Sequence, residues 1–140
     1  MSIGANTVHL GFSRLPLTKL NLSELGSIAE QQALKYLCEH GLTLVTKNFH
    51  CKLGEIDLIM QDTDVLVFVE VKYRKSSSYG TPVEAVSLSK QKKIVKTAQV
   101  YLQKQGLKEY NSECRFDVVA IEGSSTNTDI TWLKNAFYGV

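Results

Sequence analysis

The chain of 140 residues has little of the material from which disulfide scaffolds and membrane proteins are built. It has three cysteines, Cys38, Cys51 and Cys114, an odd number in which no two lie close enough to form a CxxC pair. That pattern argues against a disulfide-stapled domain or a zinc knuckle and favours a reducing compartment. No run approaches the ~18 apolar residues that a membrane-spanning helix needs. The first residues also lack the basic and apolar regions of a signal peptide. We therefore expect a cytoplasmic protein with no membrane partner.

The net charge is small as well, +2, and by itself indicates no partner. Its distribution is uneven, because residues 54–70 carry five acids and no base, whereas residues 72–104 carry eight bases and one acid. Acids followed by a basic stretch are typical of a metal site beside a phosphate-binding surface. On charge alone, however, a turn followed by a solvated helix face explains the pattern better.

The remaining composition predicts one α/β domain. Hydrophobic residues make up 44% of the chain and charged residues 21%, an ordinary balance for a globular core. Apolar residues recur at helical spacing in two segments, at about 23–40 and 89–105. Four strand-like segments are predicted at 42–49, 55–61, 65–74 and 115–122.

The order of these elements, αβββαβ, predicts a mixed sheet, with antiparallel neighbours where the connections are short. The apolar segment 130–137 is expected to pack back on the sheet. Residues 1–22 show no sustained periodicity and are interrupted by Pro16. We therefore divide the chain into an N-terminal extension, 1–22, and a folded domain, 23–140.

The third predicted strand, VLVFVEVKYR, begins apolar on both faces, which predicts a central strand covered on both sides, yet it carries charged side chains further along. Strand side chains alternate between faces, so Glu70 and Lys72 project side by side with Cα atoms about 7 Å apart. Burying two such charges costs several kcal/mol each unless they are paired or bind a metal. A buried ion pair is one interpretation. It gives a weak reason for these residues, because apolar replacements of such pairs are often neutral.

A metal site is the other interpretation, and the preceding strand supplies a partner for it. If the two strands pair through the turn at 62–64, the carboxylate of Asp57 converges with that of Glu70, and two facing carboxylates repel unless a cation separates them. Oxygen ligands suit Mg²⁺ or Mn²⁺. The nearest His and Cys, His50 and Cys51, are too few to favour zinc. A metal held by Asp57 and Glu70 beside Lys72 suits phosphodiester hydrolysis.

Six segments, in this order, resemble the YraN-like family of predicted endonucleases. They are LGSIAEQQALKYL, GEIDLIM, FVEVKYR, YGTPVEAVSLSKQKKI, RFDVVAIEG and KNAF, and the resemblance runs from about Gly26 to Phe137. An acid on one strand followed by E-x-K on the next also resembles the PD-(D/E)XK nuclease signature, with Ile56 in the place of its proline. The resemblance implies a restriction-endonuclease-like αβββαβ core with a central mixed sheet flanked by helices. It also implies kinship with archaeal-type Holliday-junction resolvases, and hence a homodimer.

The resemblance also assigns site residues. Carried onto this chain, the catalytic residues are Glu30, Asp57, Glu70 and Lys72. Glu30 lies at the rim of the first helix's apolar face, about 20° beyond Leu37. Glu55 rivals Asp57 by face parity but sits at an easily solvated strand end, so we rank it as a supporting residue. Gln91 falls within the apolar arc of the second helix, where it either supports the metal ligands or is a satisfied structural amide.

Further residues are candidates for contacts with nucleic acid. The basic stretch predicts phosphate contacts from Arg74, Lys75, Lys90, Lys92, Lys93 and Lys96, against the plainer reading of a solvated face. Tyr79 and Trp132 have rings that could stack on bases, but packing explains them better. We interpret Asp117 as structural, paired with an arginine.

The sequence thus predicts a Mg²⁺- or Mn²⁺-dependent endonuclease acting on DNA, including branched or structured DNA. One alternative is a nucleic-acid-binding protein that keeps the nuclease fold and cuts little. Another is a protein-interaction module. Metal binding distinguishes the first two from the third, and cleavage distinguishes the first from the second.

Overall fold

The computed structural model describes residues 21–75, 83–106, 113–123 and 128–138. All but the last two residues of the predicted extension, and also Tyr79, lie outside these ranges. The elements are α1 (Leu22–Glu39), β1 (Thr43–Cys51), β2 (Gly54–Asp62), β3 (Val65–Arg74), the short 3₁₀ helix η4 (Val83–Ala85), α2 (Leu88–Lys104), β4 (Cys114–Gly123) and β5 (Thr128–Phe137).

Local chemistry fixes both ends of α1. At its start the side chain of Asn21 accepts a hydrogen bond from the Glu24 N–H, and the Glu24 carboxylate accepts one from the Asn21 N–H, which completes a capping box. At its end Gly41 has φ of 98°, and the N–H of Leu42 bonds to the carbonyl of Leu37. This is a Schellman ending, which favours glycine at the left-handed position.

The five strands form one mixed sheet in the order β1-β2-β3-β4-β5. β3 and β4 run parallel, and all other neighbours run antiparallel. Parallel neighbours need a long crossover, and α2 provides it between β3 and β4. β3 therefore lies in the middle of the sheet, as the sequence predicts.

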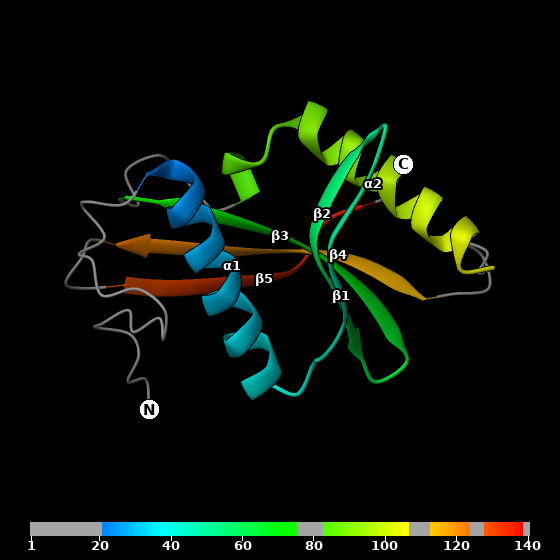
Figure 1. The fold of residues 1–140 in the computed structure, drawn as a ribbon. Coiled ribbons are helices and arrows are strands. Elements are labelled where there is room, and N and C mark those ends of the chain that lie inside the picture. Colours follow the sequence, from blue (N-terminus) through cyan, green and yellow to red (C-terminus); the bar gives the residue numbers. More distant parts are fainter. Residues whose placement is uncertain (1–20, 76–82, 107–112, 124–127, 139–140) are drawn as a thin grey trace.

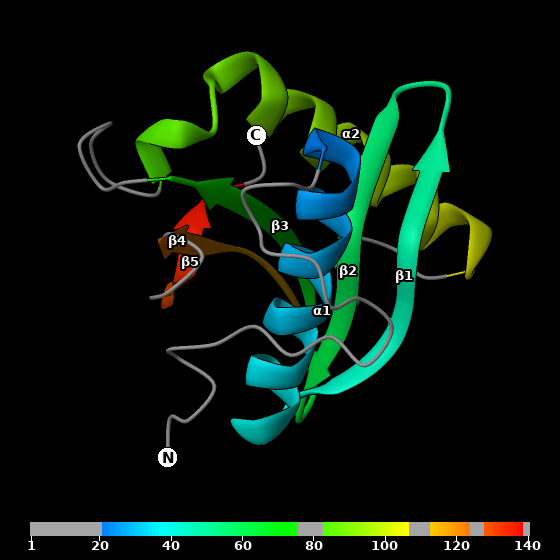
Figure 2. The same cartoon turned by 60° about the vertical axis from the view of Figure 1, so that its left-hand side comes forward.

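The two helices cover opposite faces of the sheet (Figure 1; Figure 2). On the α1 face the core consists of Ala29, Ala33, Leu37, Leu42, Leu58, Met60, Val67, Val69, Val119 and Ile121. On the α2 face it includes Ile94, Val95, Ala98, Tyr101, Leu102, Ile56, Ile59, Leu66, Phe68, Phe116, Val118 and Phe137. Val67 and Phe68 thus face opposite layers, so the predicted α/β architecture with a doubly covered third strand is confirmed.

The last strand is the part that the sequence described incompletely. Residues 130–137 do pack on the sheet, but as most of β5, paired antiparallel with β4. Strict alternation of side chains is interrupted there, because the β4–β5 register shifts between Phe116 and Val118 and Asn135 has φ of 55°. An irregular strand of this kind lacks the period-two pattern by which strands are predicted.

Candidate functional site: a fork between two strands

The site lies where β2 and β3 separate, beyond the pair Leu58–Val69, and we call this place the fork. The two strands pair from Asp62–Val65 to Leu58–Val69, which is their last paired position. Beyond it, the Asp57 carboxylate accepts a hydrogen bond of 2.8 Å from the backbone N–H of Val71. The side chain of Asp57 thereby takes the place of a β2 carbonyl as the acceptor for β3.

The side chains of β2 also change faces at this point. Leu58 and Met60 belong to the α1 layer, and Ile59 to the α2 layer. Strict alternation would return Ile56 to the α1 layer, yet it packs in the α2 layer. The irregularity falls at Asp57, which explains how its carboxylate reaches the gap between the strands. The alternation of side chains along the sequence alone therefore could not decide whether Asp57 or Glu55 is the acid of the site.

Glu70 stands beside this gap and is buried, with 5% of its surface exposed. Burial, together with repulsion from Asp57, raises the pKa of Glu70 to about 8, although the charges of Lys90 and Lys72 oppose the rise. Burial also raises the pKa of Asp57, against the lowering effects of the Val71 N–H and Lys90. The two carboxyls therefore lie near each other where the pairing of β2 and β3 ends.

Glu30 joins the pair from the other layer. It comes from α1 and is half-buried. Burial, followed by repulsion from Asp57 and Glu55, raises the pKa of Glu30 to about 7. Because β2 and β3 separate at the fork, the Glu30 side chain from α1 reaches the acids that these two strands carry. The structure places Glu30, Asp57 and Glu70 together, as the sequence predicts, with Glu55 exposed at the edge of the cluster.

Two lysines, rather than one, lie close enough to act on Glu70. Lys72 lies half-buried on β3, and its charge lowers the pKa of Glu70. Lys90 is nearer, with Nζ 3.8 Å from a carboxylate oxygen of Glu70. It sits in the first turn of α2, where its N–H donates to the Ser87 side chain that caps the helix. We predicted Lys90 as a phosphate contact. No sequence signal separates it from its neighbours, because only the crossover brings this helix end to Glu70.

The donor set of the cluster is suited to a hard cation. Asp57 and Glu70 offer carboxylate oxygens, which Mg²⁺ and Mn²⁺ prefer. Burial raises the pKa of both carboxyls, and repulsion from Asp57 adds to the rise at Glu70. In the part of the chain that the structure describes, no three His, Cys, Asp or Glu side chains are arranged as a ready metal cage. Two acids suffice for Mg²⁺, which usually keeps several waters and takes one or two carboxylates.

Two other predicted residues lie elsewhere. Arg74 is buried, with 7% of its surface exposed, and forms an ion pair with Glu122 on β4. This corrects its prediction as a phosphate contact, because a guanidinium committed to a buried carboxylate is not presented to solvent. Gln91 donates a hydrogen bond of 3.0 Å to the Val86 carbonyl and lines a surface cavity. None of its hydrogen bonds reaches Glu70 or Asp57.

The other predicted phosphate contacts remain available. Lys75, Lys92, Lys93 and Lys96 are all exposed. On α2 they divide between two flanks, because Lys92 and Lys96 border the cavity whereas Lys93 lies against Gly54 of β2. A nucleic acid contacting all of them would therefore cross the helix.

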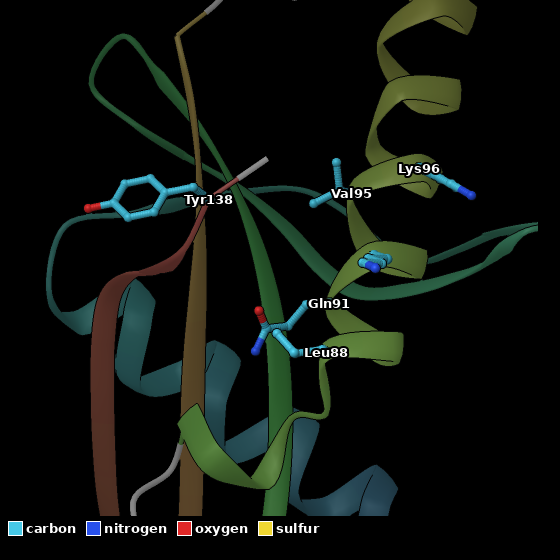
Figure 3. Close-up of a pocket in the computed structure, with 6 residues that line it drawn as sticks. Leu88, Gln91, Val95, Lys96 and Tyr138 are labelled. Carbon is cyan, nitrogen blue, oxygen red and sulfur yellow. The ribbon is translucent and has the colours of Figure 1, made fainter. Parts of the chain in front are cut away.

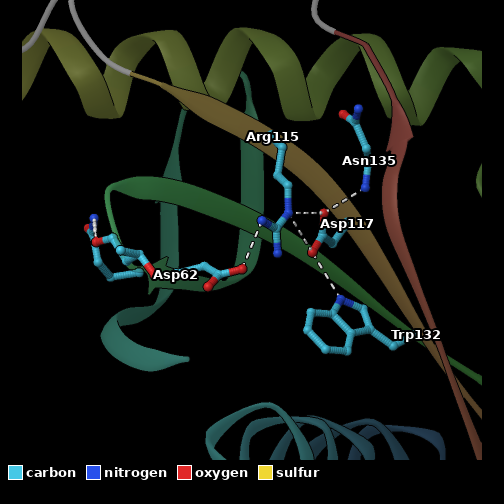
Figure 4. A network of polar contacts seen from close by, with 7 residues as sticks. Asp62, Arg115, Asp117, Trp132 and Asn135 are labelled. Carbon is cyan, nitrogen blue, oxygen red and sulfur yellow. Dashed lines mark hydrogen bonds and ion pairs between the residues drawn. The ribbon is translucent and has the colours of Figure 1, made fainter. Parts of the chain in front are cut away.

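Asp117 is structural, as predicted (Figure 4). It is fully buried, and it accepts hydrogen bonds from the Arg115 guanidinium, the Trp132 indole N–H and the Asn135 backbone N–H. Arg115 also reaches Asp62, 2.9 Å away. Trp132 is thus fixed by Asp117, which agrees with packing rather than base stacking.

The fold and this cluster together describe an α/β protein with one buried acid, two half-buried acids and two lysines at a fork in its central sheet. The chain belongs to the uncharacterised protein family UPF0102, whose model matches residues 29–121. This confirms the resemblance to the YraN-like family.

Relatives in that family span nearly the same length. A UPF0102 protein of Colwellia psychrerythraea is 51% identical over 82% of this chain and 89% of its own. One from Psychromonas ingrahamii is 47% identical over 89% of this chain and 98% of its own. One from Nitrosococcus oceani is 46% identical over 80% of this chain and 90% of its own.

Among solved structures, that of Pyrococcus furiosus SfsA in complex with Ca²⁺ matches with a TM-score of 0.39 and 10% identity. The match covers 80% of this chain and 63% of SfsA, less than two thirds of that protein. Likeness at this level carries no argument about function. Within the described ranges, no helix has the length and apolar composition that crossing a membrane takes.

Proposed function

We propose that this protein is a Mg²⁺- or Mn²⁺-dependent endonuclease of the PD-(D/E)XK class that hydrolyses phosphodiester bonds in DNA. One observation carries the proposal. The acids Asp57 and Glu70, from strands that have stopped pairing, lie close together in a gap where burial raises the pKa of both, with Lys90 and Lys72 beside them. A purely structural ion pair needs one acid and one base, and it gains nothing from a second acid whose charge raises the pKa of the first.

The roles of the residues follow from their places. Asp57 and Glu70 would hold the cation, with Glu30 closing the cluster from α1. A bound Mg²⁺ or Mn²⁺ would supply Lewis acidity toward the scissile phosphate and lower the pKa of a bound water. Lys72 would orient the attacking water and stabilise the charge that builds on phosphorus. Lys90, now paired with Glu70, would turn to a phosphate oxygen once a cation neutralises that carboxylate.

The substrate and assembly belong to the same proposal. The exposed lysines on α2 and Lys75 give a cationic surface for the DNA backbone. Branched DNA and a homodimer, both implied by the resemblance to resolvases, fit a small domain that must hold more than one duplex arm. A dimer would place two copies of the fork on one junction.

Cleavage assays on linear duplex, single strands and a four-way junction, with Mg²⁺, Mn²⁺ or EDTA, test the proposal. We expect cleavage that EDTA abolishes and that Asp57→Asn, Glu70→Gln and Lys72→Ala each reduce at least ~100-fold. Calorimetry should show weaker Mn²⁺ binding for the first two variants and unchanged binding for the third. Glu39→Gln, an exposed acid at the end of α1, is the matched control and should cleave normally.

The same assays separate the alternatives. DNA binding and Mn²⁺ binding without cleavage of any substrate would support the nucleic-acid-binding protein instead. If Mn²⁺ binds to none of these proteins, the cluster is structural and the endonuclease proposal is wrong.

A further inference from the structure

A cavity lies between α2 and the residue that follows β5 (Figure 3). Its volume is about 200 Å³. That is below the roughly 300–1,000 Å³ of sites for drug-sized ligands, and it suits one flat ring system. The lining residues are Leu88, Gln91, Lys92, Val95, Lys96 and Tyr138.

The walls of this cavity include large apolar side chains left in solvent. Leu88 and Tyr138 are each 73% exposed, the highest values among the exposed large hydrophobic side chains of the described residues. Figure 3 shows Tyr138 on the opposite side of the cavity from α2, with its ring directed away from the helix. Two such side chains at the rim of one hollow offer apolar area that a flat ligand would remove from water.

The polar groups of the cavity specify the charge of its occupant. Lys92 and Lys96 are one helical turn apart, and no acid is among the lining residues. The amide of Gln91 donates one hydrogen to the Val86 carbonyl. Its other hydrogen and its oxygen make no hydrogen bond with the described residues, so a donor and an acceptor are available to a ligand.

We propose that this cavity binds one unpaired base of a DNA strand. On binding, the exposed ring of Tyr138 turns over the cavity and stacks on the base, Leu88 and Gln91 meet its edge, and Lys92 and Lys96 at the rim hold the phosphates on either side. Residues four apart on a helix have Cβ atoms about 5–6 Å apart, which matches the step between successive phosphates of an extended strand. An acidic peptide would satisfy the lysines but supplies no flat polar-edged ring between two anions.

The position of the cavity connects it with the fork, and in this respect the inference rests on the proposed function. Lys90, which contacts Glu70, is in the same first turn of α2 as Leu88 and Gln91. The cavity and the acids therefore lie on opposite flanks of a helix about 10–12 Å wide. A strand that crosses the start of α2 reaches both. Because an intact duplex offers no unpaired base, the cavity selects DNA with unpaired nucleotides beside the cut, as at branches and flaps.

Binding measured without metal tests the cavity apart from cleavage. In EDTA, fluorescence anisotropy compares a short single strand with the same strand carrying abasic sites. Since stacking of a base on an aromatic ring is worth about 1–3 kcal/mol, Tyr138→Ala should weaken binding of the base-bearing strand roughly 5- to 150-fold. Tyr138→Phe should bind as the original protein does, and the abasic strand should not distinguish the three proteins.

The lysines have their own readout. Changing Lys92 and Lys96 together to Ala should make the salt dependence of single-strand binding shallower by about 1.4, because each phosphate contact contributes about 0.7 to the slope. Lys104→Ala, at the far end of the same helix, removes a lysine that lies over the Phe49 ring and should leave the slope unchanged.

Three results would overturn the inference: equal binding of base-bearing and abasic strands, no effect of Tyr138→Ala, or displacement of the strand by an acidic, aromatic peptide that binds more tightly. These outcomes are independent of the endonuclease. If the variants lose binding but the original protein cuts nothing, the inference about the cavity is supported and the endonuclease proposal is wrong. If the original protein cuts and Tyr138→Ala cuts a flapped substrate equally well, the endonuclease proposal is supported and the inference about the cavity is wrong.

Discussion

At the scale of single residues, the acids of the fork oppose the stability of the fold that holds them. Glu70 is buried beside Asp57, and its pKa is raised to about 8. A carboxyl whose pKa is higher in the folded than in the unfolded state binds its proton more tightly when folded. Each such group therefore lowers stability as the pH rises from its unfolded pKa to its folded pKa. Lys90 and Lys72 reduce this cost without removing it.

A pH series without metal measures the cost. The melting temperature should fall as the pH rises from about 5 to about 8, the window set by Glu70, with Glu30 contributing up to about 7. Mn²⁺ should reverse the fall. Glu70→Gln removes the charge, so it should melt at or above the original protein at pH 8 without metal and gain less from Mn²⁺.

The exposed acid Glu39 provides the control, because Glu39→Gln should reproduce the pH dependence of the original protein. A structural ion pair predicts the opposite of our expectation. In that case Glu70→Gln would lose stability at pH 8, since the change would leave Lys90 and Lys72 without their carboxylate.

At the scale of elements, the fork depends on how closely α2 packs on the start of β2. Gly54 opens β2 with φ of 156°. A Cβ placed on it would lie 3.1 Å from the hydroxyl oxygen of Thr97 and 3.6 Å from the Cβ of Lys93. Thr97 is fully buried, and its hydroxyl donates to the Lys93 carbonyl, so it has little freedom to move. Glycine thus sets the distance between α2, which carries Lys90, and β2, which carries Asp57.

Gly54→Ala should therefore lower the free energy of unfolding by about 1–3 kcal/mol, measured in urea, through overpacking and backbone strain. It should also weaken Mn²⁺ binding, because α2 moves relative to the acids. Gly26→Ala is the matched control. Among the described residues, no atom outside the adjacent helix backbone lies within 4 Å of a Cβ at that position in α1, so the same change there should be neutral or stabilise by up to about 1 kcal/mol. Equal effects of the two changes would contradict this account of the packing.

At the scale of the whole molecule, the buried carboxylate of Asp117 links two parts of the sheet. One is the half that contains the fork, and the other is the edge strand β5. Asp117 of β4 bonds to Trp132 and to the Asn135 backbone of β5, and through Arg115 it reaches Asp62 at the end of β2. Figure 4 shows the chain of contacts across the sheet. The network replaces ladder bonds where the β4–β5 register shifts beside Asp117.

Asp117→Ala should lower the free energy of unfolding by about 3–5 kcal/mol, because it leaves the Nε–H of Arg115 and the N–H groups of Trp132 and Asn135 without their acceptor. Asp62→Ala removes the more exposed end of the same network and should lose no more than about 1 kcal/mol. Urea unfolding compares the two. Similar losses would mean that the network does not centre on Asp117.

The sequence by itself determined the layers and predicted which acids lie near one another. Apolar periodicity predicts both helices, and the alternation in VLVFVEVKYR predicts a strand covered on both faces, because these signals are local to each element. The resemblance of ordered motifs adds Glu30 to Asp57, Glu70 and Lys72. A buried charge on a central strand can be predicted from the sequence alone, because an acid among valines has few structural explanations.

Only the tertiary structure decided which of several equivalent residues meet. The crossover places Lys90 on Glu70, buries Arg74 against Glu122, and leaves Gln91 facing a cavity. Alternation along β2 cannot show that Asp57 changes faces, because the change depends on where β2 and β3 stop pairing. Contacts between residues distant along the chain depend on the register and twist of the sheet, and those are set by packing of the whole core rather than by any single segment.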